Sequence, residues 1–372
     1  MKRTHEIVNP PRPERAVLVG HAAREGRRIA PALDELALLA DTAGARVLDR
    51  LIQRRGAIHP ATFVGKGKLE ELKQRAVALE ADLVIFNDDL SPPQVRNLEK
   101  TLGLKVVDRS ELILDIFARR ARTREARLQV ELAQLEYSLP RLTGLWKHLE
   151  RQAGGIGTRG PGETQLEVDR RRVRERIAVL RHQLKAVERE RETQRRRRRR
   201  EFRAALVGYT NAGKSTLFNA LARANVFVED RLFATLDATT RQMVSPERRV
   251  ALLTDTVGFI RKLPHHLVAS FHSTLIEAAE ADQLLLVTDA ADPDFRAHME
   301  VVERTIEELV ETPRPAAVVF NKADLLDPET IGGLRVEFPG CLVVSARTGQ
   351  GLDELRAFLW QQGAEHAPRR VS

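Results

Sequence analysis

Residues 208–216 read Gly-Tyr-Thr-Asn-Ala-Gly-Lys-Ser-Thr, which is the complete pattern of a phosphate-binding loop. The apolar run 204–207 before it predicts a buried strand, and the residues from Ser215 onward predict a helix. Backbone N–H groups at a helix N-terminus point at an anion, and glycines let the backbone approach that anion closely. We therefore expect this loop to bind a nucleotide, with contacts at Gly208, Tyr209, Thr210, Asn211, Ala212, Gly213, Lys214, Ser215 and Thr216.

A second segment predicts where magnesium and the terminal phosphate are recognised. The apolar run before it predicts a strand, which ends in Asp255-Thr256-Val257-Gly258. We expect Asp255 to hold Mg²⁺ through a water, and the Gly258 N–H to sense the γ-phosphate. In the phosphate loop, Lys214 is expected to reach the β- and γ-phosphates, and the Ser215 hydroxyl is expected to ligate Mg²⁺.

The segment 233–240 between these motifs reads Phe-Ala-Thr-Leu-Asp-Ala-Thr-Thr. A mobile switch needs one hydroxyl that reaches Mg²⁺ only when the γ-phosphate is present. Thr235 is the candidate for this second metal ligand, and spacing alone leaves Thr239 and Thr240 as alternatives. The expected nucleotide contacts of this switch are Phe233, Ala234, Thr235, Leu236 and Asp237.

Two further motifs predict recognition of guanine. Asn321-Lys322-Ala323-Asp324 follows a predicted strand, and Ser345-Ala346-Arg347 follows another. The Asp324 carboxylate can accept hydrogen bonds from guanine N1–H and the 2-amino group, whereas adenine lacks both donors. The Lys322 stem can cover the base, and Asn321 can tie its loop to the phosphate loop. The backbone of Ser345, Ala346 and Arg347 is expected to cap the guanine edge.

The order of these motifs predicts the fold of residues 201–365. Each motif follows the C-terminal end of a predicted strand, which indicates a doubly wound GTPase domain with a mostly parallel sheet and helices on both faces. GTP is then the substrate and Mg²⁺ the cofactor of a phosphoanhydride hydrolase. We expect catalysis to involve Lys214, Thr235, Asp255 and Gly258.

The residues after Gly258 predict slow hydrolysis by the isolated protein. Many GTPases place a Gln there to orient the attacking water. In this chain the next residues are Phe259 and Ile260, which cannot orient water by hydrogen bonding. Our hypothesis is that a partner completes the site.

Strand and helix signals alternate along the first hundred residues, which favours a small parallel α/β domain over residues 1–109. The expected strands are 16–20, 45–50, 83–86 and 105–107, and the expected helices are 29–40, 69–79 and 92–102. The string Val64-Gly65-Lys66-Gly67-Lys68 opens a helix and is either a plain turn or a phosphate site for RNA or a second nucleotide.

Residues 110–200 predict a long, basic helical hairpin. Apolar residues recur at helical spacing on both sides of a glycine-rich stretch, 154–162. Pro140 is expected to kink or break the first helix, and Thr164 to Glu167 offer a capping box for the second. The arginine run 195–200 marks the boundary to the GTPase domain, and residues 366–372 form a tail.

Charge is distributed unevenly over the 372 residues, whose formal net charge is +9. Residues 1–200 carry 43 Lys and Arg against 28 Asp and Glu, whereas the remainder is acidic. This imbalance favours contact with RNA, although a solvated arginine-rich surface is the alternative. With one cysteine, no apolar signal segment and no membrane-length run, we expect a cytoplasmic protein without stable membrane insertion.

The chain resembles the HflX family of translational GTPases. The likeness lies in the nucleotide motifs and in two hairpin strings, Gln129 to Tyr137 and Gly160 to Glu167. It implies a ribosome-associated GTPase that binds the large subunit near the peptidyl-transferase centre, splits stalled or idle ribosomes, and holds Mg²⁺ with Ser215 and Thr235. It also places the glycine loop against ribosomal RNA, with expected contacts at Arg151, Gly155, Gly157 and Arg159.

The resemblance also implies a departure, because many members carry a further C-terminal domain and this chain is expected to be a short form without it. We expect a monomer that hydrolyses GTP slowly alone and is stimulated by ribosomes. Two alternatives remain at this point. One is a GTPase switch that does not act on ribosomes, with the hairpin as a spacer or dimerising coiled coil. The other is an RNA remodeller with a second, ATP-binding site in the N-terminal domain.

Overall fold

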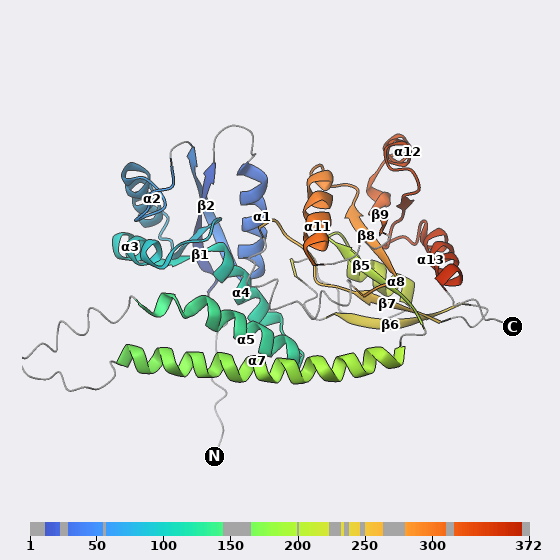
Figure 1. Cartoon of the computed structure of the whole chain (residues 1–372). Helices are drawn as coiled ribbons and strands as arrows, with labels where there is room; N and C mark the ends of the chain where they lie inside the picture. Colours follow the sequence, from blue (N-terminus) through green and yellow to red (C-terminus); the bar gives the residue numbers. More distant parts are fainter. Residues whose placement is uncertain are drawn as a thin grey trace, which may run out of the picture. The chain divides into compact units, whose positions relative to one another are not determined.

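The computed structural model of the chain describes residues 12–22, 29–54, 57–143, 165–198, 201–222, 232–233, 238–245, 250–262, 280–309 and 316–366 (Figure 1). These residues divide into two compact units. The first contains a small sheet with its helices and extends into helix α4. The second begins at Phe117 and contains a helical hairpin and a larger sheet.

The first unit is built on a four-stranded parallel sheet in the order β2-β1-β3-β4. Valine and phenylalanine side chains of its central strands form a buried core with the flanking helices, which confirms the expected parallel α/β domain. The strands are β1 (Glu14–Ala22), β2 (Ala45–Arg54), β3 (Leu83–Phe86) and β4 (Lys105–Val107), and the helices are α1 (Ile29–Thr42), α2 (Lys66–Ala78) and α3 (Pro92–Leu102).

The first helical segment of the hairpin region is interrupted, which the sequence pattern did not predict. Helix α4 (Arg109–Arg120) ends, and α5 (Arg124–Ser138) begins after a short break. The physical reason is a local cap, because the Thr123 side chain accepts a hydrogen bond from the Ala126 N–H at 3.1 Å. A helix break was expected at Pro140, and helix α5 ends two residues before it, at Ser138. The short 3₁₀ helix η1 (Arg141–Thr143) follows.

Helices α5 and α7 (Gln165–Arg198) lie side by side and form the hairpin (Figure 1). Their seam is a cluster of Leu128, Leu132, Ile177 and Leu180, and further leucines and a valine pack around it. Arg176 donates two hydrogen bonds to Glu131, at 2.7 and 2.9 Å, across the seam. The glycine-rich stretch lies outside the described residues.

The second sheet has six strands in the order β10-β9-β8-β5-β7-β6, and only β6 runs antiparallel to its neighbour. This confirms the doubly wound GTPase fold. The strands are β5 (Phe202–Gly208), β6 (Thr239–Val244), β7 (Val250–Asp255), β8 (Gln283–Asp289), β9 (Ala316–Asn321) and β10 (Leu342–Val343). The described helices are α8 (Lys214–Ala222), α11 (Phe295–Leu309), η2 (Ala323–Leu325), α12 (Pro328–Glu337) and α13 (Leu352–His366).

Strand β6 bears on the choice among the three threonines of the expected switch. Thr239 and Thr240 begin this strand and pair with Asp255 and Thr254 of β7. The hydroxyls of Thr240 and Thr254 lie 2.9 Å apart. Residues in a regular sheet ladder are poor candidates for a mobile metal ligand, which disfavours Thr239 and Thr240. Thr235 lies outside the described residues, so its assignment stays a prediction.

Leucine, valine and phenylalanine side chains of the central strands pack against α8 and α13 to form the core of the second unit. This core fixes the strand ends from which the nucleotide loops project. Among the described residues, no helix combines the length and apolarity needed to cross a membrane.

Leu180 is fully buried in the hairpin seam, whereas its neighbour Val179 is 47% exposed. We expect Leu180→Ala to lower the free energy of unfolding by about 2–5 kcal/mol because it leaves a cavity. Val179→Ala is the matched control and should cost well under about 1 kcal/mol. Urea unfolding followed by circular dichroism measures both, and equal effects of the two substitutions would contradict the described seam.

Candidate functional site

The phosphate loop connects β5 to α8 and is shaped by two residues with positive φ, Asn211 at 63° and Gly213 at 84°. A Cβ atom at Gly213 would lie 2.3 Å from Asn321 Nδ2, so only glycine fits there. Helix α8 begins at the next residue, Lys214. The backbone N–H groups of a helix's first turn point toward the position that an anion would take.

The Lys214 ammonium is held over this loop by the loop's own backbone. Lys214 Nζ donates to the carbonyl oxygens of Gly208 and Tyr209, at 3.0 and 2.8 Å. An ammonium has three N–H donors, so one remains for a phosphate oxygen. Burial lowers the pKa of Lys214 to about 8, and the negative charge of Asp255 opposes that shift.

Ser215 and Asp255 place two oxygen atoms together beside the loop. The Ser215 hydroxyl donates to Asp255 Oδ2 at 2.7 Å, and Asp255 is fully buried at the end of β7. Hydroxyl and carboxylate oxygens are ligands that Mg²⁺ prefers, and the ion also takes phosphate oxygens. The next residue, Thr256, anchors this segment because its hydroxyl donates to the Leu206 carbonyl at 2.7 Å.

The segment that follows Asp255 is bonded to the phosphate loop through the backbone. The Thr210 N–H donates to the Phe259 carbonyl at 2.8 Å, and the Phe259 N–H donates to the Gly208 carbonyl at 3.1 Å. A Cβ atom at Gly258 would lie 2.7 Å from the Thr210 side chain and 3.1 Å from Lys214 Nζ. Gly258 therefore sits where its N–H can be close to a terminal phosphate. Val257, Phe259 and Ile260 are buried.

Asn321 connects three loops of the site. Its Nδ2 donates to the Ala212 carbonyl in the phosphate loop at 2.9 Å, and its Oδ1 accepts from the Ala346 N–H at 3.0 Å. Its backbone carbonyl accepts from the Ala290 N–H at 3.0 Å. Asn321 is 2% exposed, so both bonds of its carboxamide are shielded from water.

Asp324 lies where guanine recognition was expected, and its carboxylate is held by two neighbours. The Ser345 hydroxyl donates to Asp324 Oδ1 at 2.5 Å, and Arg347 forms an ion pair with Oδ2. The Ser345 hydrogen bond, followed by the Arg347 charge and hydrogen bond, lowers the pKa of Asp324 and keeps it an acceptor. The backbone N–H of Ala323 donates to the Val344 carbonyl at 3.1 Å, which joins the two guanine loops.

Of the other residues that were predicted to contact the nucleotide or RNA, the structure describes only some. Thr216 lies in the first turn of α8, and Phe233 is buried with a φ of 56°. The Phe233 ring packs edge-to-face on Phe117 of α4, with ring centroids 4.7 Å apart. The other switch residues and the RNA candidates lie outside the described residues: Ala234, Thr235, Leu236, Asp237, Arg151, Gly155, Gly157 and Arg159.

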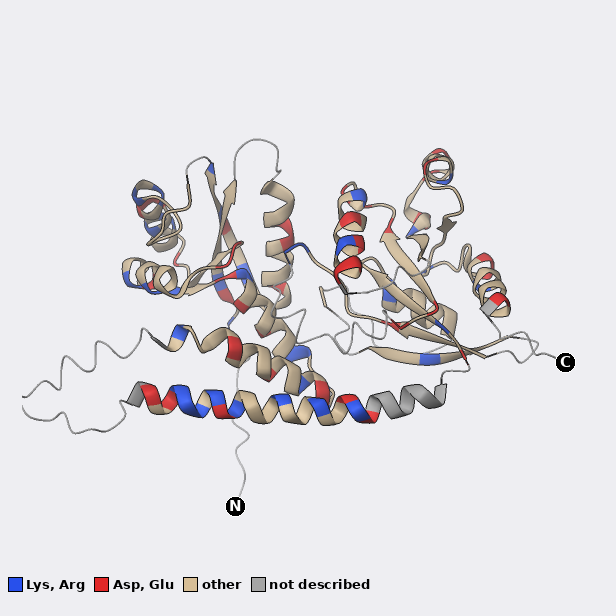
Figure 2. Cartoon of the chain, viewed as in Figure 1, with Lys and Arg blue, Asp and Glu red and all other residues tan. Residues whose placement is uncertain are grey.

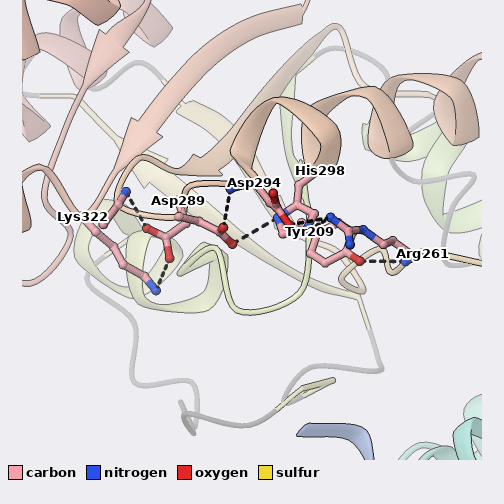
Figure 3. Close-up of polar contacts among 8 residues, drawn as sticks. Tyr209, Arg261, Asp289, Asp294, His298 and Lys322 are labelled. Atoms are coloured by element: carbon pink, nitrogen blue, oxygen red, sulfur yellow. Dashed lines mark hydrogen bonds and ion pairs between the residues drawn. The ribbon is translucent and has the colours of Figure 1, made fainter. Parts of the chain in front are cut away.

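Several residues around the site were missed by the sequence analysis. Lys322 Nζ pairs with Asp289 Oδ2 at 2.7 Å, so an acidic residue at the end of β8 positions the lysine of the guanine loop. Figure 3 shows this pair and a second group formed by Tyr209, Arg261, Asp294 and His298. An acidic residue at the C-terminal end of a predicted strand was the available signal for Asp289.

Three family models match the chain and together cover most of it. A GTP-binding GTPase N-terminal model matches residues 30–118, and a GTP-binding GTPase middle-region model matches residues 120–198. A model of 50S ribosome-binding GTPases matches residues 203–322, which span the phosphate loop and reach into the guanine motif.

Curated relatives agree with these matches. GTPase HflX of Lacrimispora saccharolytica is 51% identical over 345 residues, which are 92% of this chain and 81% of the relative. GTPase HflX of Escherichia coli is 46% identical over 327 residues, which are 87% and 77% of the two chains. The chain belongs to the GTPase HflX family. It is accordingly a GTP hydrolase of a ribosome-binding GTPase class, and the expected family resemblance is confirmed.

A solved structure supports the fold of this HflX-family chain. The crystal structure of SsGBP in complex with GDP aligns with a TM-score of 0.50 and 24% sequence identity, covering 95% of this chain and 100% of that chain. At this identity the likeness concerns the fold alone.

The lowered pKa of Lys214 gives a prediction about proton uptake on binding. A bound triphosphate stabilises the ammonium, so the pKa rises on binding from about 8 in the free protein. At about pH 8.5 about three quarters of the free Lys214 is neutral, so GTP binding should take up as much as about 0.75 of a proton, against only about 0.1 at pH 7. Calorimetry in buffers of different ionisation enthalpy measures this uptake, and an uptake that does not rise between the two pH values would contradict the assignment.

Proposed function

We propose that this GTPase binds the large ribosomal subunit through its basic N-terminal half and hairpin, and that it splits or rescues ribosomes in a GTP-dependent manner. The observation that carries this proposal is the match of residues 203–322 to the model of 50S ribosome-binding GTPases. The 51% sequence identity to an HflX relative, over 92% of the chain, supports it. The hairpin carries many Arg and Lys side chains, which can bind the phosphates of RNA.

Helix α7 offers the basic surface for this contact. Figure 2 shows Lys and Arg along the coloured part of this helix, with acidic residues between them. Exposed basic residues on α7 include Arg171, Arg172, Arg174, Arg181, Lys185 and Arg189. Some of them pair with carboxylates of the hairpin, as Arg181 does with Glu136 at 2.7 Å. Such exposed pairs contribute little to stability, so RNA phosphates can replace the carboxylates at small cost.

The nucleotide site fits a magnesium ion with GTP. We assign Ser215 and the switch Thr235 as its protein ligands, with Asp255 bonded to a water of the ion. An Mg²⁺ ion held by these residues would neutralise the negative charge that develops on the phosphates during hydrolysis. Lys214 contributes a second positive charge at the same phosphates, and Gly258 donates its N–H to the γ-phosphate.

The two residues that follow Gly258 offer no side-chain hydrogen bond to an attacking water. Phe259 and Ile260 are each 1% exposed and carry no hydrogen-bonding side chain. We therefore infer slow hydrolysis in isolation and stimulation when the ribosome completes the site. In other GTPases a group supplied by a partner raises the rate by about 10³- to 10⁵-fold.

The Phe117–Phe233 pair offers a route by which the nucleotide controls the hairpin. Phe233 begins the expected switch, two residues before Thr235, and its ring is buried against Phe117. Phe117 lies in the last turn of α4, which leads directly into α5 of the hairpin. Ordering of the switch on GTP would hold Phe233 in place, and its release would free that end of the hairpin.

Cosedimentation with purified large ribosomal subunits tests the proposal. We expect binding that is at least about tenfold tighter with a non-hydrolysable GTP analogue than with GDP. Subunit profiles of 70S ribosomes, with and without GTP, then measure splitting. Absence of nucleotide-dependent binding to ribosomes would contradict the proposal and favour a switch with another target. ATPase activity that survives Lys214→Ala would favour the second-site alternative.

Phe117→Leu tests the coupling route because it keeps apolar volume and removes the aromatic contact. An edge-to-face pair contributes about 1 kcal/mol, so the preference for the GTP analogue over GDP in ribosome binding should fall about fivefold. Phe338→Leu is the matched control, because it removes an edge-to-face contact with Phe320 in the same unit. An unchanged preference in Phe117→Leu would rule out this route.

A further inference from the structure

The turn between β8 and α11 carries three aspartates, and each is bonded to a different residue around the nucleotide site. Asp289 pairs with Lys322 of the guanine loop at 2.7 Å. Asp292 Oδ2 lies 3.2 Å from His298 Nδ1, and Asp294 Oδ2 lies 3.2 Å from an Arg261 guanidinium nitrogen. Figure 3 shows the Asp289–Lys322 pair on one side and the group with Asp294 and Arg261 on the other. The turn therefore contacts Lys322 on the guanine side of the site and Arg261 on the phosphate side.

Tyr209 connects the phosphate loop to this network. Its phenol oxygen accepts a hydrogen bond from the Arg261 backbone N–H at 2.8 Å. Its ring stacks on the His298 ring, with centroids 3.9 Å apart and an interplanar angle of 12°. Tyr209 is only 8% exposed, although it belongs to a loop at the mouth of the site. Its side chain thus links the phosphate loop to α11 and to the segment after Gly258.

His298 is held on three sides, and its bonds fix its protonated nitrogen. Its Nε2 lies 3.2 Å from the Arg261 guanidinium, which can only donate. Nε2 is therefore an acceptor, and Nδ1 carries the proton that is donated to Asp292. The other oxygen of Asp292 accepts from the Asp294 N–H at 2.8 Å, just before α11 begins. These contacts hold the imidazole in a single orientation.

Arg261 is the residue on which the network converges. Tyr209 holds its backbone N–H, while Asp294 and His298 hold its guanidinium. It lies three residues after Gly258 and two after Phe259. The backbone N–H and C=O of Phe259 both form hydrogen bonds with the phosphate loop. Residues 258–261 are therefore held at two points, by the backbone hydrogen bonds of Phe259 and by the side chains around Arg261.

We infer that Tyr209, His298 and Asp294 are positioning residues for GTP hydrolysis. They act through Arg261 to hold residues 258–261 against the phosphate loop, so that the Gly258 N–H stays aimed at the γ-phosphate. A hydrogen bond to a transferring phosphoryl group stabilises the transition state only if its donor is already placed, within about 0.5 Å of the productive geometry. The proposal concerns the hydrolysis step and does not depend on ribosome binding.

A structural role and a positioning role predict different kinetic results. If the network only stabilises the fold, its loss weakens nucleotide binding and thermal stability together. If it positions Gly258, its loss slows hydrolysis of bound GTP and leaves GDP affinity nearly unchanged, because GDP lacks the γ-phosphate.

Single-turnover hydrolysis without ribosomes separates these cases, using Tyr209→Phe and Asp294→Asn in the full chain. Tyr209→Phe removes the acceptor for the Arg261 N–H, and Asp294→Asn removes the negative charge that pairs with the Arg261 guanidinium, while each keeps the shape of the side chain. We expect each rate for bound GTP to fall about fivefold, with the GDP dissociation constant changed by less than about twofold. Because both changes act on Arg261, the double variant should lose less than the product of the two single losses.

Arg296→Gln is the matched control on the same helix. It removes an exposed ion pair between Arg296 and Glu337, 2.5 Å apart, which does not touch the network. Its rate should equal that of the original chain. Unchanged rates in both test variants, or rate losses matched by equal losses of GDP affinity, would overturn the inference. Failure of the chain to bind ribosomes would leave this result unaffected, so the two proposals are tested separately.

Discussion

The carboxamide of Asn321 is the interaction on which the arrangement of the nucleotide site depends. One amide group donates to the phosphate loop at Ala212 and accepts from the second guanine loop at Ala346. The loops that it joins lie far apart in the sequence, after strands β5, β9 and β10 of one sheet, and β8 separates β5 from β9. Both bonds are buried, where an unmade hydrogen bond costs more than in water. The spacing between the phosphate end and the guanine end of the site is thereby fixed before a nucleotide arrives.

Hydrogen bonds to neighbouring groups also explain how the site tolerates buried charges. Lys214 and Asp255 are both buried, and each is bonded by neighbouring groups, the ammonium by two carbonyls and the carboxylate by Ser215. The ammonium keeps a third N–H for a phosphate oxygen, and the Ser215–Asp255 pair lies where a metal ion is expected. Groups that are already placed in this way lower the reorganisation needed on nucleotide binding.

The sequence predicted the features that local patterns encode. Glycine and lysine at fixed spacing located the phosphate loop, and motifs after apolar runs located the strand ends, so the doubly wound fold followed. The break before Thr123 was missed, because one capping hydroxyl competes with a continuing helical pattern. The Tyr209–His298 stack and the Asp289–Lys322 pair were also missed. Tyr209 lies in a loop position that many residues can occupy, and only the three-dimensional packing of α11 shows what its ring meets.

Calorimetric titration of Asn321→Ala with GDP and ADP tests the central claim most directly. The account predicts that two lost hydrogen bonds weaken GDP binding by about 10²-fold and reduce the preference for GDP over ADP in the same variant. Both effects should arise together because one side chain holds both ends of the site. A variant that remains folded, loses phosphate affinity and keeps its full preference for guanine would contradict the account.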